Sequence, residues 1–247
     1  MLKNGIKEVV ITGIHVASYG IDFNNNTRLI DLLEEIQKIN GIERIRLGSL
    51  EPNIITEEFV NRLKNVTKIC DHFHLSLQSG CNETLKRMNR KYTAEGFEKE
   101  VNLLRKTFPN VTLTTDIIVG FPGETDEEFD TTYKYLERIK FTKTHVFKYS
   151  PRKGTIAEKM KEQISPEIKE NRSKKLIELS NKNEKDFLKK FIGNNVDVLF
   201  EQKNGKFYKG HTKNYIEVET EGENLENKIK TVTITDTDGL ILRGNLM

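Results

Sequence analysis

The sequence predicts an α/β protein in which a parallel sheet of five strand–helix repeats precedes a small all-β barrel. Up to about residue 150, short apolar runs alternate with longer amphipathic segments, which is typical of βαβ units. After Gly193 the hydrophobic period changes to two, and turn dipeptides such as Asn204-Gly205 separate the runs. These two patterns together indicate two domains of different class.

The parallel strands are expected where apolar and β-branched residues cluster. Their ranges are Glu8–Ile14, Arg44–Ser49, His72–Leu77, Val111–Val119 and Thr142–Tyr149. Helices are expected at Thr27–Asn40, after Thr56, at Thr93–Phe108 and after Thr125, with Thr56 and Thr125 as N-caps. Periodicity alone leaves open whether the sheet is flat and doubly wound or curved into a barrel.

The second part begins with a long helix that we expect to run from Pro166 to about Lys190, with Ser165 as its N-cap. Because it is polar on most sides, it is expected to be an exposed connector. Gly193 is expected to end it. Five short strands should then close a barrel, because closure removes exposed strand edges. Their ranges are Asn195–Glu201, Lys206–His211, Tyr215–Glu219, Lys228–Thr235 and Leu240–Arg243. The domain boundary is expected near residues 185–193.

Composition narrows the class of protein. The net charge is only +3, which does not by itself indicate a nucleic-acid partner. The chain has two cysteines, Cys70 and Cys81, and no secretory signal, and the residues around the cysteines do not have the spacing of metal ligands. We therefore expect both to be reduced thiols. No apolar stretch is long enough to span a bilayer, so no membrane partner is expected and the expected location is cytoplasmic.

Polar residues and glycines gather where the expected strands end, and ligand sites of parallel sheets lie at those carboxyl ends. Gly13 follows the first strand, although a simple strand-ending turn explains it better when it is taken alone. Ser49 and Glu51 follow the second, where Glu51 could instead cap a helix. Gln78 follows the third, paired with Ser76 on one face; internal hydrogen bonds would satisfy this pair as well as a ligand would.

The most informative stretch runs from Thr115 to Thr125. Asp116 lies inside an apolar strand, where an unpaired charge is unfavourable. Gly120 and Gly123 bracket an apolar turn that could lie flat against an aromatic ring. After the last strand, Arg152 and Lys153 could bind an anion, or could simply belong to a solvated loop. No Walker loop, GxGxxG turn, HExxH helix or nucleophile elbow is present, so the residues predict a cofactor pocket of unspecified chemistry.

Taken together, these stretches resemble the radical-SAM methylthiotransferases over nearly the whole chain. Five blocks occur in that family's order and spacing: TGIHVASYG, RIRLGSLEP, HFHLSLQSGCNETLKRMNRKYT, TDIIVGFPGETDEEF and HVFKYSPRKGT. The C-terminal segment, with GHTKNYIEVE and LENKIKTVTIT, resembles the TRAM domain, an OB-like RNA-binding barrel. GIHVASYG and LGSLEP are most similar to the branch that acts on N6-threonylcarbamoyladenosine in tRNA.

The resemblance implies a partial, five-stranded radical-SAM β/α barrel over residues 1–188 and a TRAM domain over residues 189–247. It implies S-adenosylmethionine, two [4Fe-4S] clusters in the full-length enzyme, tRNA as partner, and methylthiolation at C2 of an adenine. No protein side chain is expected to be a catalytic acid or base. The implied cofactor-binding residues are Gly13, Ser49, Glu51, Gln78, Asp116, Ile118, Gly120, Phe121 and Pro122, and the implied RNA-binding residues are Arg152, Lys153, Lys209, His211 and Lys213.

The chain departs from the family pattern in two places. The glutamate expected three residues after Gly120 is displaced by one, since Gly123 stands there and Glu124 follows, which puts a cofactor contact by Glu124 in doubt. The CxxxCxxC loop and the N-terminal cysteines of the second cluster do not occur. Since a cluster needs at least three thiolates held together, we expect no metal in this chain and no activity without the N-terminal part of the enzyme.

Two other functions compete with an enzyme fragment. An RNA-binding module would use the expected barrel and the Lys-rich helix (from Lys174 to Lys190) to bind phosphates without chemistry, with a steep salt dependence. An unrelated α/β enzyme with a cofactor pocket would instead have an open sheet.

Overall fold

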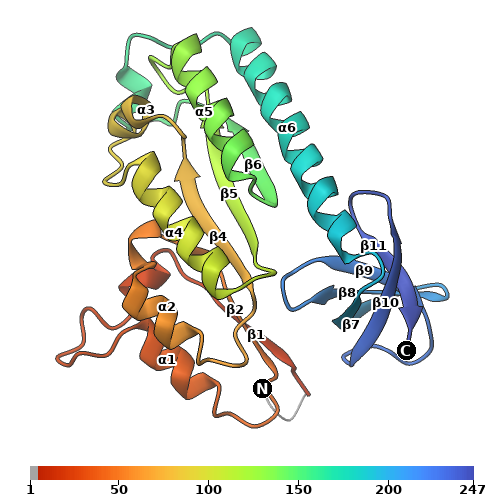
Figure 1. Ribbon diagram of the computed structural model, residues 1–247. Helices are drawn as coiled ribbons and strands as arrows, with labels where there is room; N and C mark the ends of the chain where they lie inside the picture. Colours follow the sequence, from red (N-terminus) through yellow and green to blue (C-terminus); the bar gives the residue numbers. More distant parts are fainter. Residues whose placement is uncertain (1–4) are drawn as a thin grey trace.

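The computed structural model describes residues 5–247 and consists of a parallel sheet covered by helices and a closed five-stranded barrel (Figure 1). Gly48 interrupts one strand, so that β2 pairs with β1 on one side and β3 pairs with β4 on the other. All these pairs are parallel, which confirms the predicted α/β class. The strands are β1 (Glu8–Ile11), β2 (Arg44–Leu47), β3 (Ser49–Leu50), β4 (His72–Gln78), β5 (Thr112–Val119) and β6 (Lys143–Lys148).

Several of the helices on one side of the sheet begin at side-chain caps. The hydroxyls of Thr56 and Thr125 accept hydrogen bonds from the backbone N–H groups of Phe59 and Glu128, as predicted. Each such cap stabilises a helix by about 1 kcal/mol. One short helix, α3, was not predicted from the sequence. The helices are α1 (Leu29–Ile36), α2 (Glu57–Leu63), α3 (Asn82–Arg87), α4 (Ala94–Thr107) and α5 (Asp126–Ile139).

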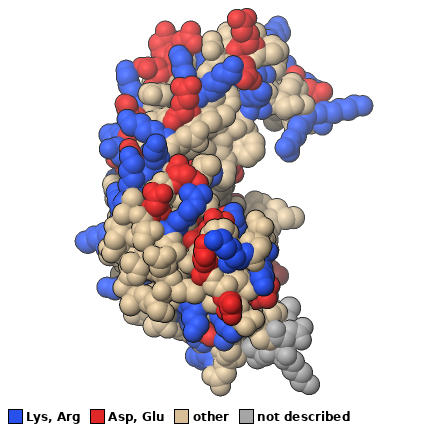
Figure 2. All heavy atoms as spheres, turned by 90° about the vertical axis from the view of Figure 1, so that its right-hand side faces the viewer, with Lys and Arg blue, Asp and Glu red and all other residues tan. Residues whose placement is uncertain are grey.

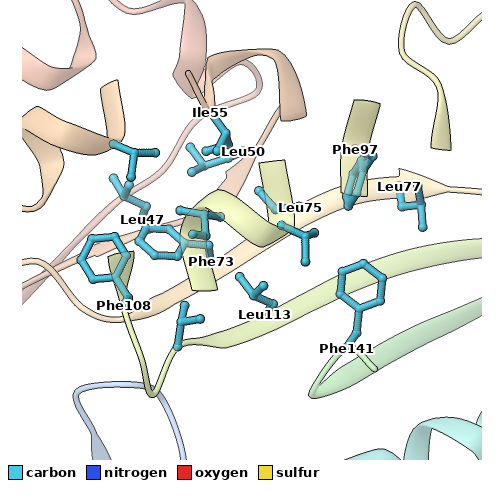
Figure 3. Packing of buried hydrophobic residues seen from close by; sticks show 14 of the residues in the cluster. Leu47, Leu50, Ile55, Phe73, Leu75, Leu77, Phe97, Phe108, Leu113 and Phe141 are labelled. Carbon is cyan, nitrogen blue, oxygen red and sulfur yellow. The ribbon is translucent and has the colours of Figure 1, made fainter. Parts of the chain in front are cut away.

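The hydrophobic core lies between these helices and the sheet. Figure 3 shows side chains of β4 and β5, including Phe73, Leu75 and Leu113, pointing toward residues of the covering helices and loops. Because side chains alternate along a strand, the neighbouring residues point to the opposite side. That side, which we call the polar face, carries Arg44, Arg46, His72, His74, Asp116 and His145.

The long helix α6 (Pro166–Leu188) is not the exposed connector that its polar composition suggested. It lies along the edge strand β6 and buries Leu176 and Leu179 in the sheet's core. The hydroxyl of Ser180 accepts a 2.9 Å hydrogen bond from the backbone N–H of Thr144, so α6 satisfies part of an otherwise open strand edge. None of the helices in residues 5–247 is long and apolar enough to cross a membrane.

The predicted C-terminal barrel is closed, in the order β10-β11-β9-β8-β7. Gly193, with φ +84°, precedes it, and its core includes Val198, Phe200 and Tyr208. This second cluster of buried residues is separate from the core of the sheet, although α6 contributes to both. The strands are β7 (Asn195–Asn204), β8 (Phe207–Thr212), β9 (Glu217–Glu221), β10 (Ile229–Thr237) and β11 (Leu242–Leu246).

The barrel is docked against the amino-terminal ends of the parallel strands. Arg44, only 4% exposed, donates to the carbonyl oxygens of His211 (2.8 Å) and Asp197 (2.9 Å). On the barrel side, Lys213 donates to the carbonyl oxygen of Thr67 and Asn214 donates to that of Asn110. Polar bonds of this kind fix the orientation of the barrel relative to the sheet.

Candidate functional site

A cavity of about 450 Å³ lies where β4, β5 and β6 end, and we call it the strand-end cavity. Three of the predicted cofactor-binding residues line it together: Gln78, Asp116 and Ile118. Phe147, 53% exposed, provides an aromatic wall, and Arg152 reaches the cavity from the loop after β6. This combination of an aromatic surface, amide and carboxylate groups and a cation suits a polar ligand with a flat ring.

The backbone at Gln78, in the wall of this cavity, has a strained conformation. Its φ is +70°, a conformation that costs a non-glycine residue roughly 1–3 kcal/mol unless its surroundings hold it. The hydroxyl of Tyr92 lies 2.7 Å from the carbonyl oxygen of Ser76 and 3.0 Å from that of Leu77, which anchors the strand end just before Gln78. Strained residues of this kind cluster at ligand sites.

The turn after β5 is held from behind by α6. Gly120 has φ +69° and donates its backbone N–H to Glu124 Oε2 over 2.7 Å. The same oxygen accepts a 2.6 Å bond from Arg172, whose other nitrogen bonds Asp126. Glu124 is only 3% exposed, and burial raises its pKa, while the N–H of Gly120 and the charge of Arg172 act in the opposite direction. Glu124 therefore supports the turn and does not face the cavity.

The other predicted cofactor residues are spread more widely. Phe121 packs edge-on against Tyr149, with ring centroids 5.2 Å apart, and none of Gly120, Phe121 and Pro122 lines the cavity. Glu51 is at the N-cap position of the short 3-10 helix Pro52–Ile54, but its side chain makes no capping bond and does not line the strand-end cavity. Its carboxylate instead lies 2.7 Å from His15 Nδ1. Ser49 lines a second cavity, and Gly13 lines neither. Cofactor contacts by these six residues stay predictions.

Sequence reasoning did not find the partner of Asp116. His74 Nε2 lies 3.2 Å from Asp116 Oδ2, and His74 Nδ1 lies 2.9 Å from the hydroxyl of Thr114. His145 is opposite Asp116 in the strand register. The alternation of His72 and His74 in β4 was a visible signal that both lie on the polar face. The carboxylate of Asp116, whose side chain is 28% exposed, is therefore only half-buried and has a partner.

The predicted RNA-binding residues of the barrel all have protein partners. Lys209 lies 2.8 Å from Glu217, His211 Nδ1 lies 3.1 Å from Glu201, and Lys213 is engaged in docking. Figure 2 shows that Lys and Arg on this side of the molecule are interspersed with Asp and Glu. RNA binding by these residues, and by Lys153 in its exposed loop, stays a prediction.

The two thiols are buried and are poor metal ligands. Burial raises the pKa of Cys70 to about 12 and also raises that of Cys81, so both stay protonated near neutral pH. Metals bind the thiolate form. Within residues 5–247 no group of three or more His, Cys, Asp or Glu side chains is arranged to hold a metal ion.

Comparison of the sequence with known proteins assigns the chain to a family. The model of the radical SAM superfamily matches residues 1–136. A tRNA-2-methylthio-N(6)-dimethylallyladenosine synthase from Acetivibrio thermocellus is 38% identical over 250 residues, which cover 98% of this chain and 52% of that protein. The threonylcarbamoyladenosine tRNA methylthiotransferase MtaB from Bacillus subtilis is 39% identical over 241 residues, covering 95% and 53%. The chain thus spans about half the length of the curated relatives it matches.

Solved structures agree at the level of the fold. Coproporphyrinogen III oxidase (HemN) from Escherichia coli, a radical SAM enzyme, aligns with a TM-score of 0.52 at 15% identity, over 74% of this chain and 50% of that one. Elp3 from Methanocaldococcus infernus aligns with a TM-score of 0.51 at 19% identity, over 70% and 44%. The resemblance predicted from five sequence blocks is confirmed, and the chain belongs to the radical SAM superfamily.

Proposed function

We propose that this chain is part of a tRNA methylthiotransferase that places a methylthio group on C2 of N6-threonylcarbamoyladenosine beside the anticodon. The observation that carries the proposal is the identity of 38–39% to two named tRNA methylthiotransferases along almost the entire chain. Such coverage includes both the strand-end cavity and the C-terminal barrel. The proposed enzyme acts on tRNA in the cytoplasm.

The choice of substrate rests on two blocks, TGIHVASYG and LGSLEP, which end the first two strands and are most similar to the threonylcarbamoyladenosine branch. Relatives of both branches match at nearly equal identity, so overall similarity does not decide between them. Methylthiolation of another tRNA base, N6-dimethylallyladenosine above all, is therefore the alternative.

The strand-end cavity fits the adenosyl part of S-adenosylmethionine. Gln78, strained and at the cavity wall, offers an amide to a ring edge or a ribose hydroxyl, and Ile118 and Phe147 offer flat apolar contact. Arg172 and Glu124 keep the turn behind this wall in place. When bound beside a reducing cluster, S-adenosylmethionine supplies the radical chemistry, and the side chains named here bind and orient it.

The residues present do not fit an iron–sulfur cluster. Cys70 and Cys81 are buried, protonated and only two, whereas a cluster is held by at least three thiolates. We therefore assign the ligands of the two [4Fe-4S] clusters to the N-terminal part of the same enzyme and expect this chain alone to be inactive.

We also propose a domain division near residues 188–189, which the two separate clusters of buried residues support, although Leu188 at the end of α6 packs with the barrel. We assign the C-terminal barrel to RNA binding as a TRAM domain. A module that binds RNA without chemistry is the second candidate, favoured by the absence of cluster ligands among the described residues.

The binding preference of the purified chain tests the substrate assignment. Fluorescence anisotropy with tRNA that carries N6-threonylcarbamoyladenosine, N6-dimethylallyladenosine or unmodified adenosine should give the tightest binding for the first. Equal binding of all three would support the RNA-binding module, and preference for the second would move the chain to the other branch.

A further inference from the structure

A second cavity, also of about 450 Å³, lies on the polar face between the sheet and the C-terminal barrel, and we call it the histidine cleft. Four of the chain's five histidines line it. They come from both parts of the molecule, His72, His74 and His145 from the sheet and His211 from the barrel. No function described above uses this concentration of aromatic side chains.

Tyr215 is at the centre of the aromatic groups. Its ring stacks with His211 (centroids 4.6 Å apart, planes at 16°) and with His72 (4.8 Å, 28°), and the guanidinium of Arg46 lies 4.5 Å from its centroid. The residue has φ +65°, which is unfavourable for a bulky side chain, yet it remains 49% exposed. Because these groups cover the faces of the ring, the exposed half of Tyr215 offers its edge, which suits edge-to-face contact with another flat ring.

The walls of the cleft supply both hydrogen-bonding and apolar groups. His74 and His145 have ring centroids 5.8 Å apart, and Lys143 pairs with Glu184 over 2.9 Å. Leu240, 66% exposed, projects at the lip from the β10–β11 turn. Exposed apolar residues beside hydrogen-bonding side chains are the composition of a ligand site.

Two buried polar atoms of the cleft residues have no hydrogen-bond partner among the described residues. They are Nδ1 of His72 and the hydroxyl of Thr112, and these two residues are 9% and 4% exposed. His72 and Thr112 are direct neighbours in the β4–β5 register. Unsatisfied buried groups are rare in proteins, and their presence beside a cavity is a sign of a polar occupant.

The charge of the cleft distinguishes a base from a phosphate. Burial lowers the pKa of His72 to about 3 and also lowers that of His145, so both rings are neutral at pH 7. The charged groups at the cleft are paired: Lys143 with Glu184, Glu217 with Lys209, and Arg46 with Glu8. A neutral, aromatic, hydrogen-bonding cleft suits an uncharged heteroaromatic ring better than an anion.

We propose that the histidine cleft binds an unpaired base of the substrate RNA other than the base that reacts. The proposal rests on the proposed function for the presence of RNA. Along β6, His145 of the cleft and Phe147 of the strand-end cavity are two residues apart, or roughly 7 Å in a strand. Two separate sites on one face therefore bind two different nucleotides of a single strand.

The test follows the histidine ring signals of the whole chain by NMR. The probes are a mononucleotide, ribose 5-phosphate, and a single-stranded RNA of anticodon-loop sequence. The mononucleotide and the RNA should shift the four cleft histidines and leave His15, which lies outside the cleft, unchanged. Equal shifts with ribose 5-phosphate would make the cleft an anion site and overturn the proposal.

Two variants measure the contribution of the cleft to affinity. His145→Leu and Tyr215→Leu keep side-chain bulk, and each should weaken binding of the single-stranded RNA about 5- to 150-fold, the range that about 1–3 kcal/mol of base stacking corresponds to. Asn61→Leu, a neutral substitution at an exposed position of α2 outside both cavities, is the matched control and should leave affinity unchanged. Circular dichroism checks that both variants fold.

The outcomes separate this inference from the proposed function. If tRNA binds the wild-type chain and both variants equally and the cleft histidines do not shift, the inference is wrong and the proposed function stands. If the wild-type chain binds neither tRNA nor the single-stranded RNA, both are wrong.

Discussion

Replacing Arg172 of α6 with methionine should destabilise the chain strongly. The guanidinium is 5% exposed and bonds the carboxylate of Glu124 at 2.6 Å, its backbone carbonyl at 3.0 Å, and Asp126 at 2.8 Å. In the variant, the buried carboxylate of Glu124 keeps only the backbone N–H of Gly120 as a described partner. The substitution therefore leaves a buried charge without its counter-charge.

The magnitude follows from this burial. Removing one member of a buried ion pair costs about 3–5 kcal/mol, whereas removing both charges costs far less. The double variant Arg172→Met/Glu124→Gln should therefore be more stable than the sum of the single changes by roughly 2 kcal/mol, within the usual range for contacting residues.

The effect should also depend on pH with a defined sign. Burial raises the pKa of Glu124 in the native state above its value in the unfolded state. The native state therefore takes up this proton first as the pH falls, and the contribution of Glu124 to stability is lost as the pH rises through the raised pKa. Without Arg172 the pKa of Glu124 should rise further, because the opposing positive charge is gone. The destabilisation by Arg172→Met should therefore be larger at pH 8 than at pH 5.

Urea unfolding followed by circular dichroism measures all four proteins of this cycle at both pH values. A loss below about 1 kcal/mol for Arg172→Met, or strict additivity in the double variant, would refute the view that α6 holds the turn through this pair.

Three further predictions concern other parts of the molecule. Arg44→Met removes two hydrogen bonds from a charged donor, each worth about 1.5–3 kcal/mol, so the barrel should undock and limited proteolysis between sheet and barrel should accelerate; an unchanged cleavage rate would contradict this. Because burial lowers the pKa of His72 to about 3, well below its unfolded value, stability should fall as pH falls from about 6.5 toward 3, by up to roughly 1.4 kcal/mol per pH unit. His72→Phe should remove this contribution, and equal pH slopes in both proteins would disprove it. Gly120→Ala should destabilise by more than about 1 kcal/mol, because φ is +69° and its Cβ would lie 2.3 Å from Lys169 Cγ; Lys169→Ala should restore part of that loss in urea unfolding.

Local features of the fold were predictable because neighbouring residues determine them. Thr125 and Ser165 cap helices with their own side chains, and the turn at Asn204-Gly205 follows from residue type. The role of α6 was misjudged for a physical reason. Ser180 counts as polar in a sequence, but in the fold its hydroxyl satisfies a strand edge beside Leu176, so a polar residue marks a buried face.

The candidate site depends on contacts that no local pattern contains. Gln78, Asp116 and Ile118 were predicted from strand ends, and they meet because parallel strands end at one edge. The histidine cleft required the register between β5 and β6 and the docking of the barrel, both of which join residues distant in sequence. Similarly, Lys209 was visible as a cation, but Glu217 opposite it was not visible as its partner.

Mass spectrometry of tRNA nucleosides tests the central claim most directly. In cells that lack the gene encoding this chain, 2-methylthio-N6-threonylcarbamoyladenosine should disappear while its precursor, N6-threonylcarbamoyladenosine, remains, and the restored gene should bring the product back. Loss of the dimethylallyl product instead would assign the chain to the other substrate branch, and an unchanged set of methylthiolated nucleosides would contradict the proposed function.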